Sequence, residues 1–230
     1  DFSAAGSNLV SNPNFTDTGS DVVINGTFAT DTDWSKNSNW TISGGEAISD
    51  GTSSASINQN SILTEGVSYK ISFEITEFTS GSGYSVRAGA GTTYPTPGVT
   101  SLGVHTFYQV ATGNPLYADV IYIVAQGNTI GKITNVTAEP LGEDWTLTDA
   151  IVSATPEGVG YYTDNGLGVS NAYAYQTILD STKNYKTSFE ILEYVAPSVG
   201  ISSGTTAGGF YPNAVGVHEK FLCPPDGNFP

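Results

Sequence analysis

Apolar and polar residues alternate along Tyr69–Phe78, and nearly the same segment returns at Tyr185–Tyr194, 116 positions later. The two segments read YKISFEITEF and YKTSFEILEY, and seven of their ten residues are identical. A period of two indicates a β-strand with one buried face and one solvated face. Because the segment is duplicated, the sequence predicts a repeat protein with a unit of about 115 residues.

Further alternating segments, separated by Gly, Asn and Pro, recur about every 8–12 residues, as in sandwich proteins. No segment carries a helical apolar stripe of useful length. We therefore predict an all-β fold with two tandem antiparallel β-sandwich (jelly-roll) repeats, the second incomplete. The predicted parts are an N-terminal extension (residues 1–20), repeat 1 (21–140) and repeat 2 (141–230). Strands of repeat 1 besides Tyr69–Phe78 are expected at Ala55–Leu63, Tyr84–Ala90, Gly103–Ala111, Ala118–Gln126 and Lys132–Ala138.

Repeat 2 lacks both ends of the unit. Asp144-Trp145 matches Asp33-Trp34, but no opening strand precedes it in repeat 2. After His105 repeat 1 continues for 33 residues to Ala138, whereas only 12 residues follow the equivalent His218. The closing strands are therefore missing from this sequence.

The N-terminal extension contains a spare opening strand. Its sequence from Leu9 through Val10 to Phe15 echoes the opening of repeat 1 from Val22 to Phe28, at an offset of 13. We expect this donor strand to complete repeat 2 of a neighbouring copy by β-augmentation, because an open sandwich exposes unpaired backbone groups. Such a contact is head-to-tail and propagates as a filament. The alternative is that the sequence simply ends before repeat 2 does.

Three stretches, Val23–Ala47, Ser68–Ile75 and Thr129–Val136, resemble a recurring jelly-roll repeat. That repeat occurs in tail, fibre and head-decoration proteins of bacterial viruses and in surface proteins of environmental bacteria. It is similar in architecture to carbohydrate-binding modules. The resemblance covers residues 22–140 and, more loosely, 141–222. It implies a structural or adhesive role without enzymatic activity, at an extracellular location or on a virion surface.

The composition argues against some classes of binding partner. The net charge is −15 with only 7 Lys plus Arg, and so acidic a surface repels phosphate, which argues against nucleic acid. No apolar run approaches the length of a membrane span, so we expect no membrane insertion. The single cysteine, Cys223, allows no intrachain disulfide.

No catalytic constellation is visible in the sequence. The two histidines, His105 and His218, occupy the same position of the repeat, which favours a structural role over a catalytic one. The carboxylate pairs Glu74/Glu77 and Glu190/Glu193 are also repeat-equivalent, unlike the opposed pair of a glycosidase. We therefore expect no enzyme activity and no obligatory cofactor.

Three classes of candidate binding residues remain, each with a plainer alternative. Exposed tyrosine rings can stack on sugars, and the alternative is that the rings pack in the core. The candidates are Tyr84, Tyr94, Tyr173, Tyr175 and Tyr211. N-glycosylation sequons begin at four asparagines, a number close to chance for this composition: Asn14, Asn25, Asn39 and Asn135. Three loop aspartates are candidate Ca²⁺ ligands, with a solvated acidic loop as the alternative: Asp31, Asp33 and Asp50.

Together these patterns favour a non-enzymatic structural subunit of an extracellular filament or virion fibre, assembled with itself as a homopolymer. The alternative function is a carbohydrate-binding adhesin or receptor-binding module that binds glycans without polymerising.

Overall fold

The computed structural model describes residues 6–11, 13–15, 17–89, 98–112, 117–148, 151–155, 158–162, 173–179, 183–192 and 212–222. Every regular element in these residues is a β-strand, and all strand pairs are antiparallel. The all-β prediction is confirmed. The chain divides into a larger unit, Asn12–Tyr175, and a smaller unit that combines Asp1–Ser11 with Gln176–Pro230; the repeat boundaries stay a prediction.

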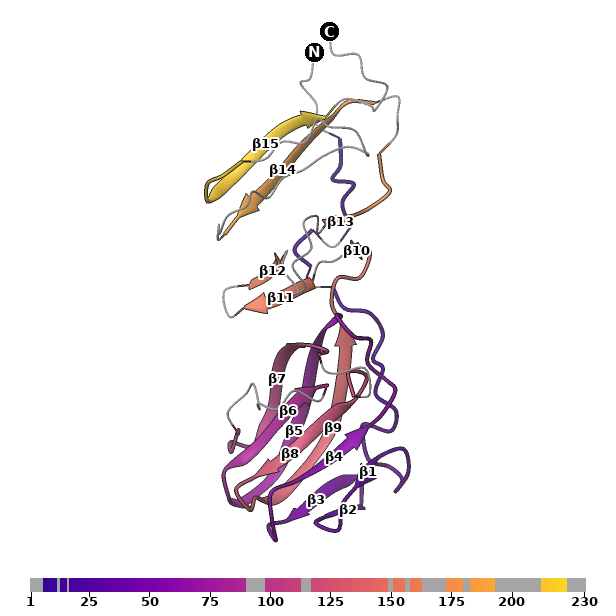
Figure 1. The fold of residues 1–230 in the computed structure, drawn as a ribbon, viewed down its shortest axis with the longest axis vertical. Helices are drawn as coiled ribbons and strands as arrows, with labels where there is room; N and C mark the ends of the chain where they lie inside the picture. The colour runs from indigo at the N-terminus through magenta and orange to yellow at the C-terminus, as the bar shows by residue number, and fades with distance from the viewer. Residues whose placement is uncertain are drawn as a thin grey trace. The chain divides into compact units, whose positions relative to one another are not determined.

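Two antiparallel sheets build most of the larger unit (Figure 1). The five-stranded sheet has the order β2-β3-β9-β5-β7, with bounds Trp40–Ser43, Glu46–Asp50, Ile130–Pro140, Ser68–Ser80 and Gly103–Val110. The four-stranded sheet has the order β1-β4-β8-β6, with bounds Ser35–Lys36, Ala55–Gln59, Ile121–Gln126 and Gly83–Ala88. Five of these strands are those that the alternating pattern predicted beside Tyr69–Phe78.

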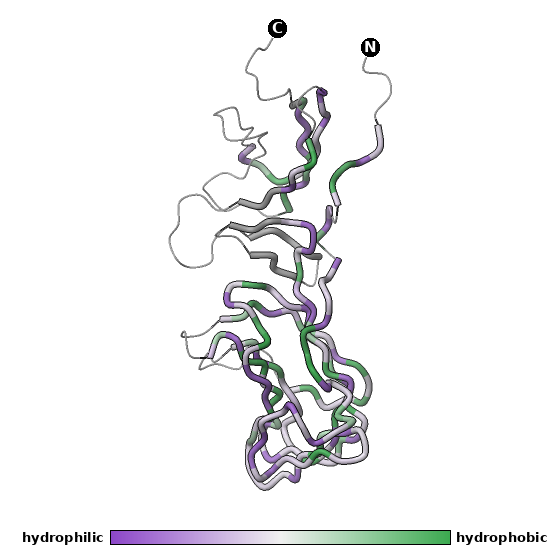
Figure 2. Tube along the Cα trace, turned by 90° about the vertical axis from the view of Figure 1, so that its right-hand side faces the viewer, coloured by the Kyte–Doolittle hydropathy of each residue, from purple (hydrophilic) through white to green (hydrophobic). Residues whose placement is uncertain are grey.

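The core lies between the two sheets. Phe73 on β5 is fully buried, and its ring centroid is 6.5 Å from that of Tyr84 on β6, across the sandwich. Trp40 on β2 also reaches Tyr84, at 6.0 Å. Burial alternates from Tyr69 to Ile75 in β5, as the period of two requires. Figure 2 shows hydrophobic and hydrophilic positions interspersed along the chain.

The turn before β6 depends on a glycine. Gly83 has a φ of +90°, and a Cβ there would lie 2.4 Å from the carbonyl oxygen of Val99. Any side chain would therefore collide with the backbone that forms the isolated bridge between Tyr84 and Val99. The turn at Ser80–Gly83 leads from β5 in one sheet to β6 in the other, so it is not the hairpin turn that its Ser-Gly sequence suggests.

The later strands form three two-stranded sheets instead of two large ones. The larger unit contains the pairs β10–β13 and β11–β12, with bounds Thr146–Thr148 and Tyr173–Tyr175, and Ile151–Thr155 and Gly158–Tyr162. The smaller unit contains β14 (Tyr185–Ile191) paired with β15 (Gly216–Leu222). The segment Tyr185–Tyr194 was predicted as a strand, and its residues Tyr185–Ile191 form β14.

β14 and β15 pair in the same register as β5 and β7. Phe73 lies opposite His105 in one sheet, and Phe189 lies opposite His218 in the other. Each histidine also contacts a carbonyl oxygen four residues earlier through Nε2, at 2.7 Å in both cases. These matched contacts agree with the structural role expected for the two histidines.

Candidate strand-docking site

Gln59, the last residue of β4, holds the opening segment of repeat 1 by its backbone. The side-chain amide accepts a hydrogen bond from the Ile24 amide at 2.9 Å and donates one to the Ile24 carbonyl at 2.8 Å. A glutamine that satisfies both backbone groups of one residue acts as a strand partner would. Because Gln59 is itself only 3% exposed, its buried amide depends on this segment.

The opening segment is also anchored by an aromatic pair. Phe28 is 1% exposed, and its ring centroid lies 5.2 Å from that of Trp34. The Trp34 indole donates to the Asn25 carbonyl at 3.1 Å, which fixes the turn that leads from Ile24 to Phe28. We call the pair of hydrogen bonds from a glutamine side chain to one backbone residue the clamp, and the aromatic pair the anchor. Together they hold the opening segment in this fold.

The N-terminal extension makes the same clamp in the smaller unit. The Ser11 amide donates to Oε1 of Gln176 at 3.1 Å, and Nε2 of Gln176 donates to the Ser11 carbonyl at 2.7 Å. Ser11 precedes Ile24 by 13 positions, the offset at which the two opening segments echo each other. The clamp therefore joins residues 165 positions apart in the sequence.

The aromatic anchor recurs in the larger unit. Phe15 and Trp145 have ring centroids 4.8 Å apart, like Phe28 and Trp34. Phe15 and Phe28 also share a left-handed backbone, with φ of 55° and 51°, which is rare for an aromatic residue. A shared rare conformation indicates the same local structure at both positions.

Of the predicted donor-strand residues, Leu9 and Val10 directly precede Ser11 in the smaller unit, whereas Phe15 belongs to the larger unit. Leu9 is 47% exposed, and Val10 and Phe15 are half-buried. Sequence reasoning missed Gln59 and Gln176 entirely. The available signal was their position, shortly before the Ile62-Leu63 and Ile178-Leu179 pairs in the two copies.

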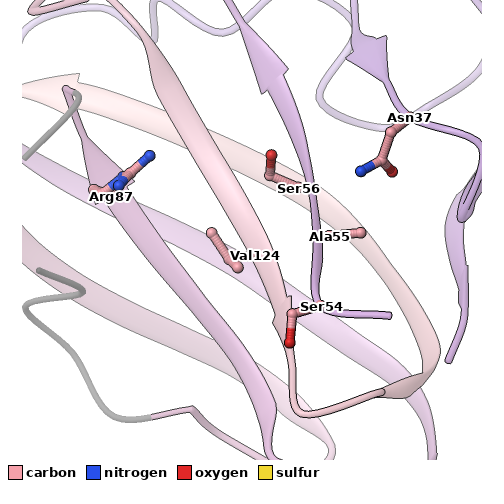
Figure 3. A pocket seen from close by; sticks show the side chains of 6 residues that line it. All are labelled: Asn37, Ser54, Ala55, Ser56, Arg87 and Val124. Atoms are coloured by element: carbon pink, nitrogen blue, oxygen red, sulfur yellow. The ribbon is translucent and has the colours of Figure 1, made fainter. Parts of the chain in front are cut away.

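A second candidate is a shallow polar depression on the outer side of the four-stranded sheet (Figure 3). It has a volume of about 140 Å³ and is lined by Asn37, Ser54, Ala55, Ser56, Arg87 and Val124. Arg87, the only arginine in the sequence, lies with its guanidinium carbon 4.6 Å from the Tyr122 ring centroid. No carboxylate lines the depression, so it offers hydrogen-bond donors and one positive charge.

The tyrosines predicted to stack on glycans are placed differently. Tyr84 is fully buried, and its hydroxyl lies 2.7 Å from Oγ of Ser49; its ring is core and not a sugar platform, which corrects the expectation. Burial raises the pKa of Tyr84 to about 12, against a smaller lowering by the Ser49 hydrogen bond. Tyr94 and Tyr211 lie outside the described residues, as do the side chains of Tyr173 and Tyr175 on β13.

Three of the four sequon amides make hydrogen bonds within the chain. Nδ2 of Asn25 donates to the carbonyls of Thr30 and Thr32, at 2.8 and 3.1 Å. Nδ2 of Asn39 donates to Ser53, and that of Asn135 donates to Glu74. An N-linked sugar attaches at this nitrogen and would disturb these contacts, whereas the exposed Asn14 has no such bond among the described residues.

The aspartates proposed for Ca²⁺ each meet a local partner. Asp31 pairs with Lys36, and Asp33 accepts a hydrogen bond from Thr32 at 2.6 Å. Asp50 accepts from the Thr52 amide at 2.8 Å, and this hydrogen bond lowers the pKa of Asp50. Within the described ranges, no three acidic, His or Cys side chains gather as metal ligands would.

The fold is that of an antiparallel β-sandwich protein, and the two segments predicted as opening strands, Leu9–Phe15 and Val22–Phe28, form no regular strand in their described residues. No protein-family model matches the chain, and no curated protein matches it significantly. Over the described residues, no helix has the length and apolarity needed to cross a membrane.

Proposed function

We propose that this chain is a non-enzymatic structural subunit of an extracellular filament or virion fibre. Neighbouring subunits join head-to-tail by β-strand complementation. The observation that carries the proposal is the clamp of Gln176 on Ser11, which docks a segment remote in sequence onto repeat 2. Recognition through main-chain groups is the mode by which proteins add a strand supplied from elsewhere.

The docked segment has the properties of an exchangeable element. Both of its hydrogen bonds to Gln176 are solvent-exposed, and Leu9 keeps 47% of its surface in solvent. Little apolar area is lost when such a segment leaves, and a second copy offers an identical segment to the same clamp. Exchange between copies is then nearly neutral per contact, and a head-to-tail arrangement extends without closing.

The test is negative-stain microscopy and size exclusion of the native full-length chain and of a variant lacking residues 1–15. This deletion retains Thr18 and Gly19, which pair with Leu141 and Pro140 at the end of repeat 1. We expect regular fibres from the full chain and monomers from the deletion. Dispersed particles from the full chain would refute the filament.

A matched pair of point variants isolates the clamp. Gln176→Ala removes the contact to Ser11, whereas Gln59→Ala removes the equivalent contact to Ile24 inside repeat 1. Loss of assembly in Gln176→Ala alone is expected. Equal assembly of both variants would show that the N-terminal segment does not join the subunits.

The depression around Arg87 supports the second candidate function, a carbohydrate-binding adhesin. Its amide, hydroxyl and guanidinium groups are the donors that orient sugar hydroxyls and carboxylates. A glycan array with acidic and neutral sugars tests this function. Binding that is lost in Arg87→Gln and retained in Lys36→Gln would support it, and a blank array would exclude it.

A further inference from the structure

β5 and β14 carry the same outward row of side chains. In both strands a lysine, a serine and a glutamate alternate with the inward residues: Lys70, Ser72 and Glu74 in β5, and Lys186, Ser188 and Glu190 in β14. β7 pairs with one edge of β5, and β15 pairs with one edge of β14 in the equivalent register. The two strands thus present equivalent side chains and an equivalent second edge.

In β5 the second edge is occupied by β9, which matches this row group by group. The contacts are Lys70 to Glu139 at 3.2 Å, Ser72 to Thr137 at 2.7 Å and Glu74 to Asn135 at 2.8 Å. These contacts are an ion pair, a hydrogen bond between two hydroxyls, and a hydrogen bond from an amide to a carboxylate. β9 is therefore the strand to which a Lys-Ser-Glu row is complementary.

The backbone of β14 points toward the same edge. The Ser68 carbonyl accepts a hydrogen bond from the Leu141 amide at 2.8 Å, so even-numbered residues of β5 direct their backbone groups to the β9 side. The equivalent residues of β14 are Lys186 and Ser188, whose groups then face away from β15. In the described part of the chain, the sheet of β14 has only two strands.

The inward side chains of β14 are less buried than those of β5. Phe73 and Tyr69 on β5 are 0% and 3% exposed, whereas Phe189 and Tyr185 on β14 are half-buried. The tyrosine and the phenylalanine are the same in both strands, so the difference comes from the residues around them, among them Thr187 in place of Ile71. β14 has the sequence of a central strand and, among the described residues, the position of an edge strand.

We propose that the edge of β14 that faces away from β15, which carries no strand among the described residues, takes up an antiparallel strand of the β9 type from a neighbouring polypeptide. This strand places an acidic residue opposite Lys186, a hydroxyl opposite Ser188 and an amide beside Glu190, with small or β-branched residues facing inward. The inference rests on the proposed assembly by strand complementation and adds to the exchanged N-terminal segment a second strand, at the closing position of the sheet.

The first experiment uses a fluorescein-labelled peptide copying Ile130–Pro140, titrated by anisotropy against the full chain at concentrations where size exclusion shows monomer. We expect saturable binding, and at least about tenfold weaker binding of a peptide with Thr137→Pro, because proline removes the amide that pairs with Ser72 in repeat 1. A scrambled peptide is the composition control. Equal binding of all three peptides would overturn the proposal.

A charge exchange tests the register. Lys186→Glu in the chain is expected to weaken the peptide about two- to fivefold, the range for an exposed ion pair. Glu139→Lys in the peptide should restore binding to this variant. Because Lys186 also pairs with Glu219 at 2.8 Å, Glu219→Gln in the chain separates that contact from the new one. Weakening without restoration would place the strand elsewhere.

A covalent version guards against a peptide too weak to detect. His218 lies 113 positions after His105, so a copy of residues 118–140 appended directly after Pro230 continues repeat 2 in register. We expect slower hydrogen exchange at the amides of Lys186 and Ser188 than in the parent chain. No protection together with no peptide binding would overturn the proposal. Both measurements are made on monomers, so fibres without peptide binding, or binding without fibres, tell the two proposals apart.

Discussion

β5 and β14 are nearly the same strand in two surroundings. Seven of ten residues agree between Tyr69–Phe78 and Tyr185–Tyr194, and both strands pair with a partner in one register. Yet Phe73 is fully buried, whereas Phe189 remains half-buried. The alternating pattern decides which face turns inward, and the neighbouring strands decide how deeply that face is buried.

The largest expected effect comes from truncating this phenylalanine in each strand. Phe73→Ala should lower the free energy of unfolding by about 3–5 kcal/mol, because it opens a cavity between Tyr84 and Phe107. Phe189→Ala should cost only about 1–2 kcal/mol, since half of the ring's transfer free energy is realised. Chemical denaturation followed separately for the two units checks both values. Equal losses would show that β14 is as deeply packed as β5.

This difference also marks the limit of sequence reasoning. The strand around Phe73 and its neighbours were predictable, because one buried face imposes a period of two. The clamp of Gln59 on Ile24 was not, because a single side-chain-to-backbone contact leaves no periodic signal. Tyr84 was misjudged as a sugar platform, since a tyrosine looks alike in sequence whether its hydroxyl meets Ser49 or water.

The second prediction concerns how the free energy of unfolding depends on pH through the buried Tyr84. The pKa of Tyr84 is raised from 10.0 to about 12 by burial. Below pH 10 the phenol is neutral in both states and its full contribution is present. Between pH 10 and 12 the unfolded chain loses this proton first, so the free energy of unfolding falls by about 2–3 kcal/mol.

Denaturant titrations of the parent chain and of Tyr84→Phe across this range measure that fall. The variant keeps the ring and removes the ionisable group, so its unfolding free energy should decline less between pH 10 and 12. Identical pH profiles would show that Tyr84 ionises without hindrance in the folded chain.

The third prediction compares the two glutamine clamps. Gln59→Ala should cost about 1–2 kcal/mol, because Ile24 loses partners for both backbone groups in a partly buried setting. Gln176→Ala should cost about 0.5 kcal/mol in the monomer, since its bonds to Ser11 are solvent-exposed. Hydrogen exchange at the Ile24 and Ser11 amides reports each clamp directly. Faster exchange at Ser11 than at Ile24 in the parent chain is expected, and the reverse order would contradict the comparison.

The smallest effect concerns the two matched lysines. Lys70 pairs across strands with Glu139 at 3.2 Å, whereas Lys186 pairs with Glu219 at 2.8 Å on the opposite edge. Both pairs are partly exposed, so Lys70→Met and Lys186→Met should each change the unfolding free energy by less than about 1 kcal/mol. Their salt dependence should be equally small in the monomer. On binding of a β9-type strand, however, Lys186 gains the acidic partner that Lys70 already has. Only Lys186→Met should therefore weaken binding of the peptide. If Lys70→Met weakens it to a similar extent, the peptide binds to repeat 1 instead.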